Sequence, residues 1–266
     1  MLLLLVAGLL LSLPAVAQKQ YKLVDTVKLG GEGGWDYLTY EQGAHRLFIT
    51  RGTHVMVIDT TTLKQIGDIP DLSGIHGVAL APAMNKGFVS NGGDDSVTVF
   101  DLKTLKVTDK IKVGGRPDAI LYEPFSKHVF TFNAKSQDST VVDAASGKVI
   151  ATIPLGGKPE FPASDDKGKV FVNIEDKGEI AVIDVRSNTV TTHWQLTGCE
   201  EPSALAFDVA HNRLFSGCGN KVMAVTDAAS GKVVTTVPIG GGVDAGRFNP
   251  KTQEVFMSCG DGTLPV

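Results

Sequence analysis

The sequence predicts an all-β fold, a β-propeller of four-stranded blades, and three observations support this prediction. A β-branched run that ends in aspartate returns every 41 to 43 residues, at Asp59, Asp101, Asp143, Asp184 and Asp227. Between these aspartates, apolar and polar residues alternate with the period of two typical of half-buried strands. Glycine pairs such as Gly114-Gly115 and Gly156-Gly157 separate the units. A repeat of this length with four short strands is typical of one propeller blade.

The third unit, residues 115–157, illustrates the order of the expected strands. From the inside of the blade to the outside, the predicted strands are residues 117–122, 128–133, 139–143 and 149–155. The link Ala145-Ser146-Gly147-Lys148 predicts a hairpin between the third and fourth strands, and Gly156-Gly157 lets the backbone cross to the next blade.

The repeated aspartates are interpreted as structural residues. Asp143 and Asp227 precede the identical sequence Ala-Ala-Ser-Gly-Lys, and Asp184 precedes a close variant of it. An aspartate at this position accepts hydrogen bonds from backbone N–H groups of the following turn. These carboxylates therefore hold hairpins and are poor candidates for catalysis.

The N-terminal end predicts export. Residues 2–13 are almost purely apolar, and Ala15-Val16-Ala17 before Gln18 is a small-residue cleavage pattern of the secretory type. Residues 1–17 are thus predicted to be a signal peptide, incomplete at its start because no Lys or Arg precedes the apolar run. The localisation we expect is periplasmic or extracellular.

The two ends of the repeat array predict how the ring closes. Residues 20–31 match the outer strand and exit turn at 105–115, so we expect them to form the outer strand of the last blade. Residues 258–266 parallel 90–99, so the chain stops inside the third strand of a sixth unit. We predict one propeller domain, residues 18–266, with five complete blades and part of a sixth, truncated from a seven-bladed protein.

Composition limits the class of partner. The chain has 30 glycines and a net charge of −4, without the basic field of a nucleic-acid-binding protein. No segment after the signal peptide is apolar enough to span a bilayer. We expect a monomer without a membrane span whose partner is a protein, a polymer or a small molecule, with nucleic acid disfavoured.

The starts of the innermost strands give the candidate site. Aligning the repeats places an ionisable residue there in five of six units, namely Asp36, His76, Asp118, Glu160 and Asp244. In a propeller these positions gather at one mouth of the central channel. Clustered carboxylates raise one another's pKa or recruit a cation. Asp118, Glu160 and Asp244 are the candidate ligands for calcium or another oxygen-preferring ion, and a cationic small molecule fits as well. The competing interpretation is that they bind water or cap backbone N–H groups.

A second set of polar residues lies at the ends of the predicted second strands. Asn91, Asn133 and Asn173 occupy this position, and asparagine there is more typical of a turn than of a ligand contact. Arg51 replaces asparagine in the first unit, and Arg247 follows Asp244. Either arginine can neutralise the acidic ring or clamp an anionic substrate.

Histidine and cysteine positions argue against several kinds of site. Only His76 of the six histidines joins the acidic ring, which disfavours a multi-histidine copper or zinc cluster. Cys199 and Cys218 fall at the same end of neighbouring strands, which favours a disulfide in an exported protein. Cys259 is either free or a competing partner. Gly-x-Ser-x-Gly, P-loop and Cys-x-x-Cys motifs are all missing.

The repeats resemble the YVTN family of β-propeller proteins, which includes YncE-like periplasmic proteins. The resemblance rests on the run at residues 86–91, the strand ends at 99–101 and 182–184, and the exit strand at 152–156. It covers the chain from about Tyr21 onward and implies an exported, seven-bladed, WD40-like propeller that binds a partner without established catalysis. The Tyr-Val-Thr-Asn consensus itself is altered in every blade.

These observations favour a non-catalytic exported binding or scaffold protein with a ligand or cation site at the acidic channel mouth. The first alternative is a metal-assisted hydrolase or lactonase at the same mouth, in which His76 or Glu160 moves protons. The second alternative is a DNA-binding periplasmic propeller, which rests on the family resemblance alone.

Overall fold

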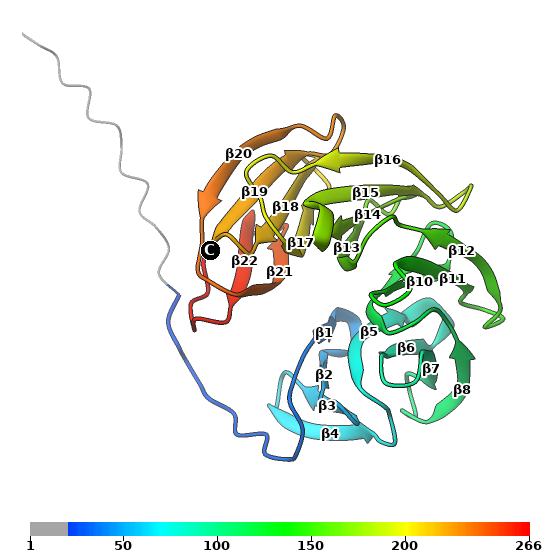
Figure 1. The fold of residues 1–266 in the computed structure, drawn as a ribbon. Helices are drawn as coiled ribbons and strands as arrows, with labels where there is room; N and C mark the ends of the chain where they lie inside the picture. The colour runs from blue at the N-terminus through cyan, green and yellow to red at the C-terminus, as the bar shows by residue number, and fades with distance from the viewer. Residues whose placement is uncertain (1–20) are drawn as a thin grey trace, which may run out of the picture. The chain divides into compact units, whose positions relative to one another are not determined.

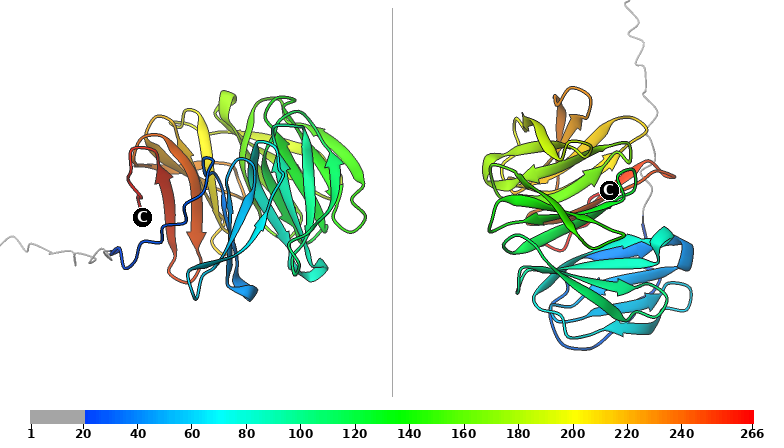
Figure 2. Two further views of the ribbon diagram at one scale, coloured as in Figure 1. Left: turned by 90° about the horizontal axis from the view of Figure 1, so that it is seen from below. Right: turned by 90° about the vertical axis from the view of Figure 1, so that its right-hand side faces the viewer.

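The computed structural model describes residues 21–266 and confirms the β-propeller. Residues 31–266 form five four-stranded antiparallel sheets and one two-stranded sheet, which follow one another in chain order around an axis (Figure 1). Seen from the side, the inner strands run along this axis (Figure 2, left). Residues 21–30 are a separate unit. The predicted signal peptide, residues 1–17, lies outside the described residues.

The strands occupy four equivalent positions in the first five blades, and the sixth has the first two of them. The innermost strands are β1 (Leu38–Glu41), β5 (Ile75–Ala81), β9 (Pro117–Glu123), β13 (Pro159–Ser164), β17 (Pro202–Asp208) and β21 (Val243–Asn249). The second strands are β2 (Arg46–Thr50), β6 (Lys86–Asn91), β10 (His128–Asn133), β14 (Lys169–Ile174), β18 (Arg213–Cys218) and β22 (Glu254–Cys259).

The outer half of each blade completes the sheet. The third strands are β3 (Val55–Asp59), β7 (Ser96–Asp101), β11 (Asp138–Asp143), β15 (Glu179–Asp184) and β19 (Val222–Asp227). The fourth strands are β4 (Lys64–Ile69), β8 (Val107–Lys112), β12 (Val149–Pro154), β16 (Thr189–Gln195) and β20 (Val233–Pro238). Two short 3₁₀ helices, η1 (Gln42–Ala44) and η2 (Pro82–Met84), lie between a first and a second strand. A third, η3 (Glu175–Lys177), lies between the second strand β14 and the third strand β15.

The core lies between neighbouring blades. The third residue of the second strand is phenylalanine in every blade, and Phe48, Phe88, Phe130 and Phe171 are almost completely buried. One apolar cluster joins Phe130 to Val170 and Ile183 of the next blade. Burial of such side chains removes apolar surface from water, so each blade is stabilised by the face of its neighbour.

The structure confirms the interpretation of the repeated aspartates. The Oδ1 atom of Asp59 accepts backbone N–H bonds from Thr61 and Thr62, each at 2.8 Å. Asp143 accepts the N–H and the hydroxyl of Ser146, and these hydrogen bonds hold the pKa of its carboxyl below the ordinary value. The carboxylates therefore hold the hairpins after the third strands.

The N-terminal outer strand expected at residues 20–31 is not formed. Residues 21–37 contain no strand. An outer strand pairs with the third strand of its sheet. In this blade residues 263–265 occupy the third-strand position, on the side of β22 opposite β21. The N–H groups of Met257 and Cys259 donate to the carbonyls of Pro265 and Thr263. This pairing is too short to be a strand, so the last sheet contains β21 and β22 alone.

The cysteines form one disulfide in the fifth blade. Cys199, ahead of β17, is bonded to Cys218 at the end of β18, and their Cα atoms are 5.4 Å apart. Cys259, at the equivalent position of the next blade, is a buried free cysteine. Within the described part of the chain, no helix is long and apolar enough to cross a membrane.

Removal of this disulfide is expected to destabilise the propeller. The bond closes a loop with a sequence separation of 19 residues, for which the chain-entropy relation gives about 3 kcal/mol. We expect a C199A/C218A variant to lose roughly this free energy of unfolding in a denaturant titration. Dithiothreitol should lower the melting temperature of the unmodified protein to that of the variant and leave the variant unchanged. A variant as stable as the parent protein would contradict this assignment.

Candidate functional site

A repeated irregularity of the inner strands aims the candidate residues into the channel. In β5, β9, β13, β17 and β21 the pairing with the second strand shifts by one residue near the strand start. The first inner-strand residues within these shifts are His76, Asp118, Glu160, Ser203 and Asp244. A bulge leaves its extra residue outside the regular ladder and redirects its side chain. The same local feature thus presents a polar side chain from five successive blades.

Hydrogen bonds from neighbouring blades hold these bulges in place. Ser90 of β6 donates its hydroxyl to the carbonyl of Asp118 at 2.6 Å, and the same hydroxyl accepts the N–H of Gly77 at 2.9 Å. Asn173 of β14 donates to the carbonyl of Ser203 at 3.1 Å. Ser203 in turn donates to the carbonyl of Asp244 at 3.2 Å. These bonds link the bulge of β5 to that of β9, and the bulge of β17 to that of β21, across blade boundaries.

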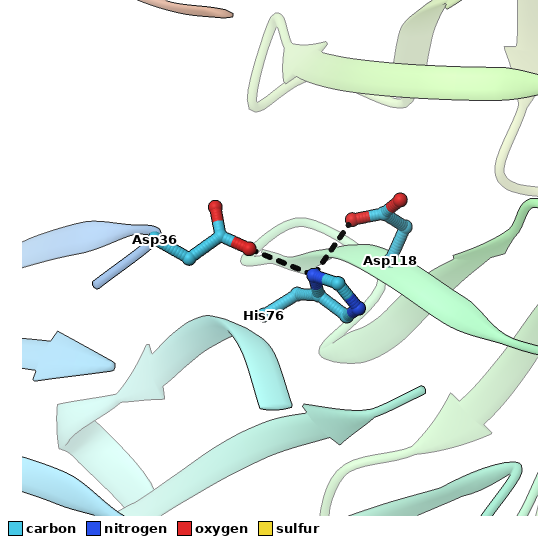
Figure 3. Close-up of side chains that lie close together, drawn as sticks. All are labelled: Asp36, His76 and Asp118. Atoms are coloured by element: carbon cyan, nitrogen blue, oxygen red, sulfur yellow. Dashed lines mark hydrogen bonds and ion pairs between the residues drawn. The ribbon is translucent and has the colours of Figure 1, made fainter. Parts of the chain in front are cut away.

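Asp36, His76 and Asp118 form the tightest group at the mouth (Figure 3). The Nδ1 atom of His76 lies 2.7 Å from Oδ2 of Asp36 and 3.3 Å from Oδ1 of Asp118. One donor atom from each residue lies within 4.8 Å of the other two. The three residues come from the first three blades, so only the folded ring brings them together.

The charges of this group are mutually dependent. The hydrogen bond that Nδ1 of His76 donates to Asp36 raises the pKa of His76 above its ordinary value, against the opposing effect of burial. Burial raises the pKa of Asp118, and the His76 charge opposes that increase. An imidazolium between two carboxylates therefore balances part of the negative charge at the mouth.

Packing fixes the orientation of the imidazole. A Cβ atom at Gly92 would lie 2.8 Å from Nε2 of His76 and 3.3 Å from the carbonyl oxygen of Gly74. The glycine thus lets the ring lie against the end of β6 with Nδ1 directed at the two carboxylates. A larger residue at this position would displace the ring.

Glu160 is neutralised by a separate partner. Its Oε1 atom lies 2.8 Å from Nζ of Lys158, which also forms an ion pair with Glu175. Burial raises the pKa of Glu160 to about 7, although Lys158 acts in the opposite direction. The two carboxylates raise the pKa of Lys158 despite its own partial burial. Glu160 can therefore gain or lose a proton near neutral pH.

Asp244 and Arg51 have different surroundings. Loss of solvation, together with repulsion from Asp36 and Asp118, raises the pKa of Asp244. Arg51 donates to the carbonyl of Gly33 at 2.9 Å and to that of Gly31 at 3.3 Å. Arg51 therefore holds the segment ahead of β1, a role that the sequence did not predict.

Arg247 lies on β21 and lines two cavities. The smaller, of about 220 Å³, also includes Trp35, Asp36, Tyr37 and Asp244. The larger lies among the inner strands of the first three blades. Arg247 therefore faces the channel.

Tyr37 and Lys158 are members of the site that the sequence analysis missed. The ring of Tyr37 is stacked on Phe161 with centroids 4.5 Å apart. Burial and the nearby carboxylates, of which Asp118 contributes most, raise the pKa of the Tyr37 phenol. Both residues lie within two positions of a predicted site residue, Asp36 or Glu160, and this adjacency is the signal that could have found them.

The asparagines at the ends of the second strands are structural. Asn91 and Asn133 are completely buried, and their amide nitrogens donate to hydroxyls of Thr98 and Thr140 on the adjacent third strands. Asn173 bridges to the next blade. These contacts agree with the structural interpretation of the sequence pattern.

Comparison with known proteins supports the fold. No family model and no curated protein matches the chain. Among solved structures, the chain is similar to a chain of hydrazine synthase from Kuenenia stuttgartiensis, with a TM-score of 0.64 and 16% sequence identity. The match covers 92% of this chain and 98% of that one. At this identity the similarity shows a shared propeller fold and gives no information about the function of the site.

The Asp36–His76 contact predicts how the pKa of His76 responds to mutation. Asp36→Asn should lower the pKa of His76, because the largest cause of its increase is removed. Since the folded pKa is raised, the pair stabilises the fold fully below the unfolded value of about 6.5 and loses its effect as pH rises through the folded pKa. NMR titration of the imidazole and unfolding at pH 5.5 and 9 test this. An unchanged pKa, or equal destabilisation at both pH values, would contradict it.

Proposed function

We propose that this protein is an exported, YVTN-like propeller that binds a divalent metal ion at the channel mouth through Asp36, His76 and Asp118. The observation that carries the proposal is the convergence of three donor atoms within 4.8 Å of one another. Donors about 2.1 Å from one ion are separated by roughly 3 Å, close to the 2.7 and 3.3 Å distances from Nδ1. The three side chains can thus contact one ion with little movement.

The donor set selects the class of metal. Calcium, which the sequence suggested, takes oxygen ligands, whereas one imidazole with two carboxylates suits zinc, manganese or another first-row transition ion. Glu160 is paired with Lys158 and is outside the group of three. We therefore propose Asp36, His76 and Asp118 as ligands in place of the set Asp118, Glu160 and Asp244.

Binding would exchange a proton for the metal ion. His76 must lose its proton before Nδ1 can coordinate, and Asp36 holds that proton by raising the His76 pKa. Metal affinity should therefore increase with pH until His76 is deprotonated in the free protein and should level off above that pH. In this respect the metal ion replaces the imidazolium as the charge that balances the two carboxylates.

Isothermal titration with Zn²⁺, Mn²⁺ and Ca²⁺ tests the site. We expect Zn²⁺ or Mn²⁺ to bind more tightly than Ca²⁺ and to raise the melting temperature reversibly with chelator. His76→Ala or Asp118→Asn should weaken binding by at least about tenfold, because each removes a ligand. Asp71→Asn is the matched control, since it removes an exposed carboxylate at a left-handed residue that asparagine tolerates. Preference for Ca²⁺, or equal affinity in all variants, would refute the proposal.

One observation favours hydrolysis as a second candidate function. The Glu160 carboxyl, with a pKa of about 7, is suited to proton transfer near neutral pH and interacts electrostatically with Asp118. An ester or lactone bound beside the metal ion would have this carboxyl as its acid or base. A metal-dependent hydrolysis that Glu160→Gln abolishes without loss of metal affinity would support this function. Unchanged turnover in that variant would exclude the role of Glu160.

A further inference from the structure

Arg247 stands in an apolar part of the channel. It lines a cavity of about 570 Å³ together with residues of β1, β5 and β9, and none of the other described residues around this cavity is charged. The remaining wall is largely aliphatic and aromatic, and includes Leu38, Val78, Leu121 and Tyr122. The cavity therefore combines one fixed positive charge with an apolar surface.

The guanidinium of Arg247 has no partner among the residues described. It forms no hydrogen bond or ion pair with any side chain or carbonyl in residues 21–266. Three carboxylates of the mouth are engaged elsewhere, since Asp36 and Asp118 contact His76 and Glu160 contacts Lys158. Asp244 lines the smaller cavity together with Arg247, but among the described residues it forms no ion pair with the guanidinium. Neighbouring protein atoms lower the pKa of Arg247 by desolvation, while the residue as a whole stays exposed to solvent and accessible to a ligand. An arginine in this position has donors available for an anion.

The geometry and charge of the side chain limit the class of anion. A guanidinium presents a planar fork that matches a carboxylate or a phosphate group in bidentate fashion, and a carboxylate balances the single positive charge at this cavity. The apolar wall adds to the binding free energy only if the ligand has an apolar body, because the wall stabilises a ligand by burying hydrocarbon surface. A small inorganic anion would use the arginine and leave the wall exposed to water.

We propose that the channel binds a small carboxylate with an apolar body, its carboxylate held by Arg247 and its hydrocarbon part against Leu38, Leu121 and Tyr122. This site is distinct from the metal site, since none of the three metal ligands lines the cavity. The sequence left two roles open for Arg247, neutralisation of the acidic ring and binding of an anion. The proposal assigns it the second role.

Isothermal titration of the full-length protein with 3-phenylpropionate, in the presence of chelator, tests the site. We expect binding that Arg247→Gln weakens by about ten- to a hundredfold, as loss of charged hydrogen bonds implies. Arg247→Lys should retain only part of the affinity, because it keeps the charge and loses the fork. Lys251→Gln removes one exposed positive charge from the same blade and should have no effect. Circular dichroism and melting temperature establish that each variant is folded.

Matched probes separate the two parts of the ligand. 3-Phenylpropanol lacks the charge and acetate lacks the apolar body, so both should bind at least about tenfold more weakly than 3-phenylpropionate. Inorganic phosphate should bind no better than acetate. Failure to bind 3-phenylpropionate, equal affinity of Arg247→Gln, or equal binding of phosphate would overturn the proposal. Because chelator is present throughout, none of these results bears on the metal site.

Discussion

The bulge at the start of each inner strand is the constraint on which the site depends. In a regular strand, side chains alternate between the two faces of the sheet, and the faces of a blade pack against its neighbours. A residue displaced from the ladder is free of this alternation and can point along the channel. The shift recurs at His76, Asp118, Glu160 and Asp244, and side chains of adjacent blades bond the backbone there. The acidic ring is therefore a consequence of the repeat and of contacts between blades.

Such a ring carries an electrostatic cost that the protein reduces locally. Burial at the mouth, together with repulsion between like charges, disfavours the ionised carboxylates and raises the pKa of Asp118 and Asp244. Two cationic side chains offset part of this cost, His76 between two aspartates and Lys158 between two glutamates. They differ in function because a histidine can give up its proton near neutral pH, while the lysine stays charged. An external cation can therefore replace the charge of the protonated histidine, but not that of the lysine.

Much of the fold could be predicted from the sequence, and part of the site. The spacing of Asp59, Asp101 and Asp143 gave the blade period, and aligning the repeats placed the ring residues at one mouth. The sequence could not show that Asp36 and Asp118 share His76 while Glu160 turns to Lys158, because that depends on side-chain directions set by the bulges. The role of Arg51 depends on the path of a glycine-rich segment, which no repeat predicts. The prediction of an outer strand at residues 20–31 was wrong. Sequence similarity to the outer strand of another blade does not provide the third strand with which it would have to pair.

The channel has charges of opposite sign at different depths. Asp244 and Arg247 are three residues apart on β21, which corresponds to about 10 Å along an extended strand. Arg247 lines the smaller cavity with Asp36 and Asp244 but forms no ion pair with either in the described part of the chain, and the stacked rings of Tyr37 and Phe161 line the same cavity. A metal ion at Asp36, His76 and Asp118 would reduce the negative field that opposes an anion at Arg247. Because linkage is reciprocal, a carboxylate at Arg247 would strengthen metal binding by the same factor. The two proposed sites would then act together although they share no ligand residue.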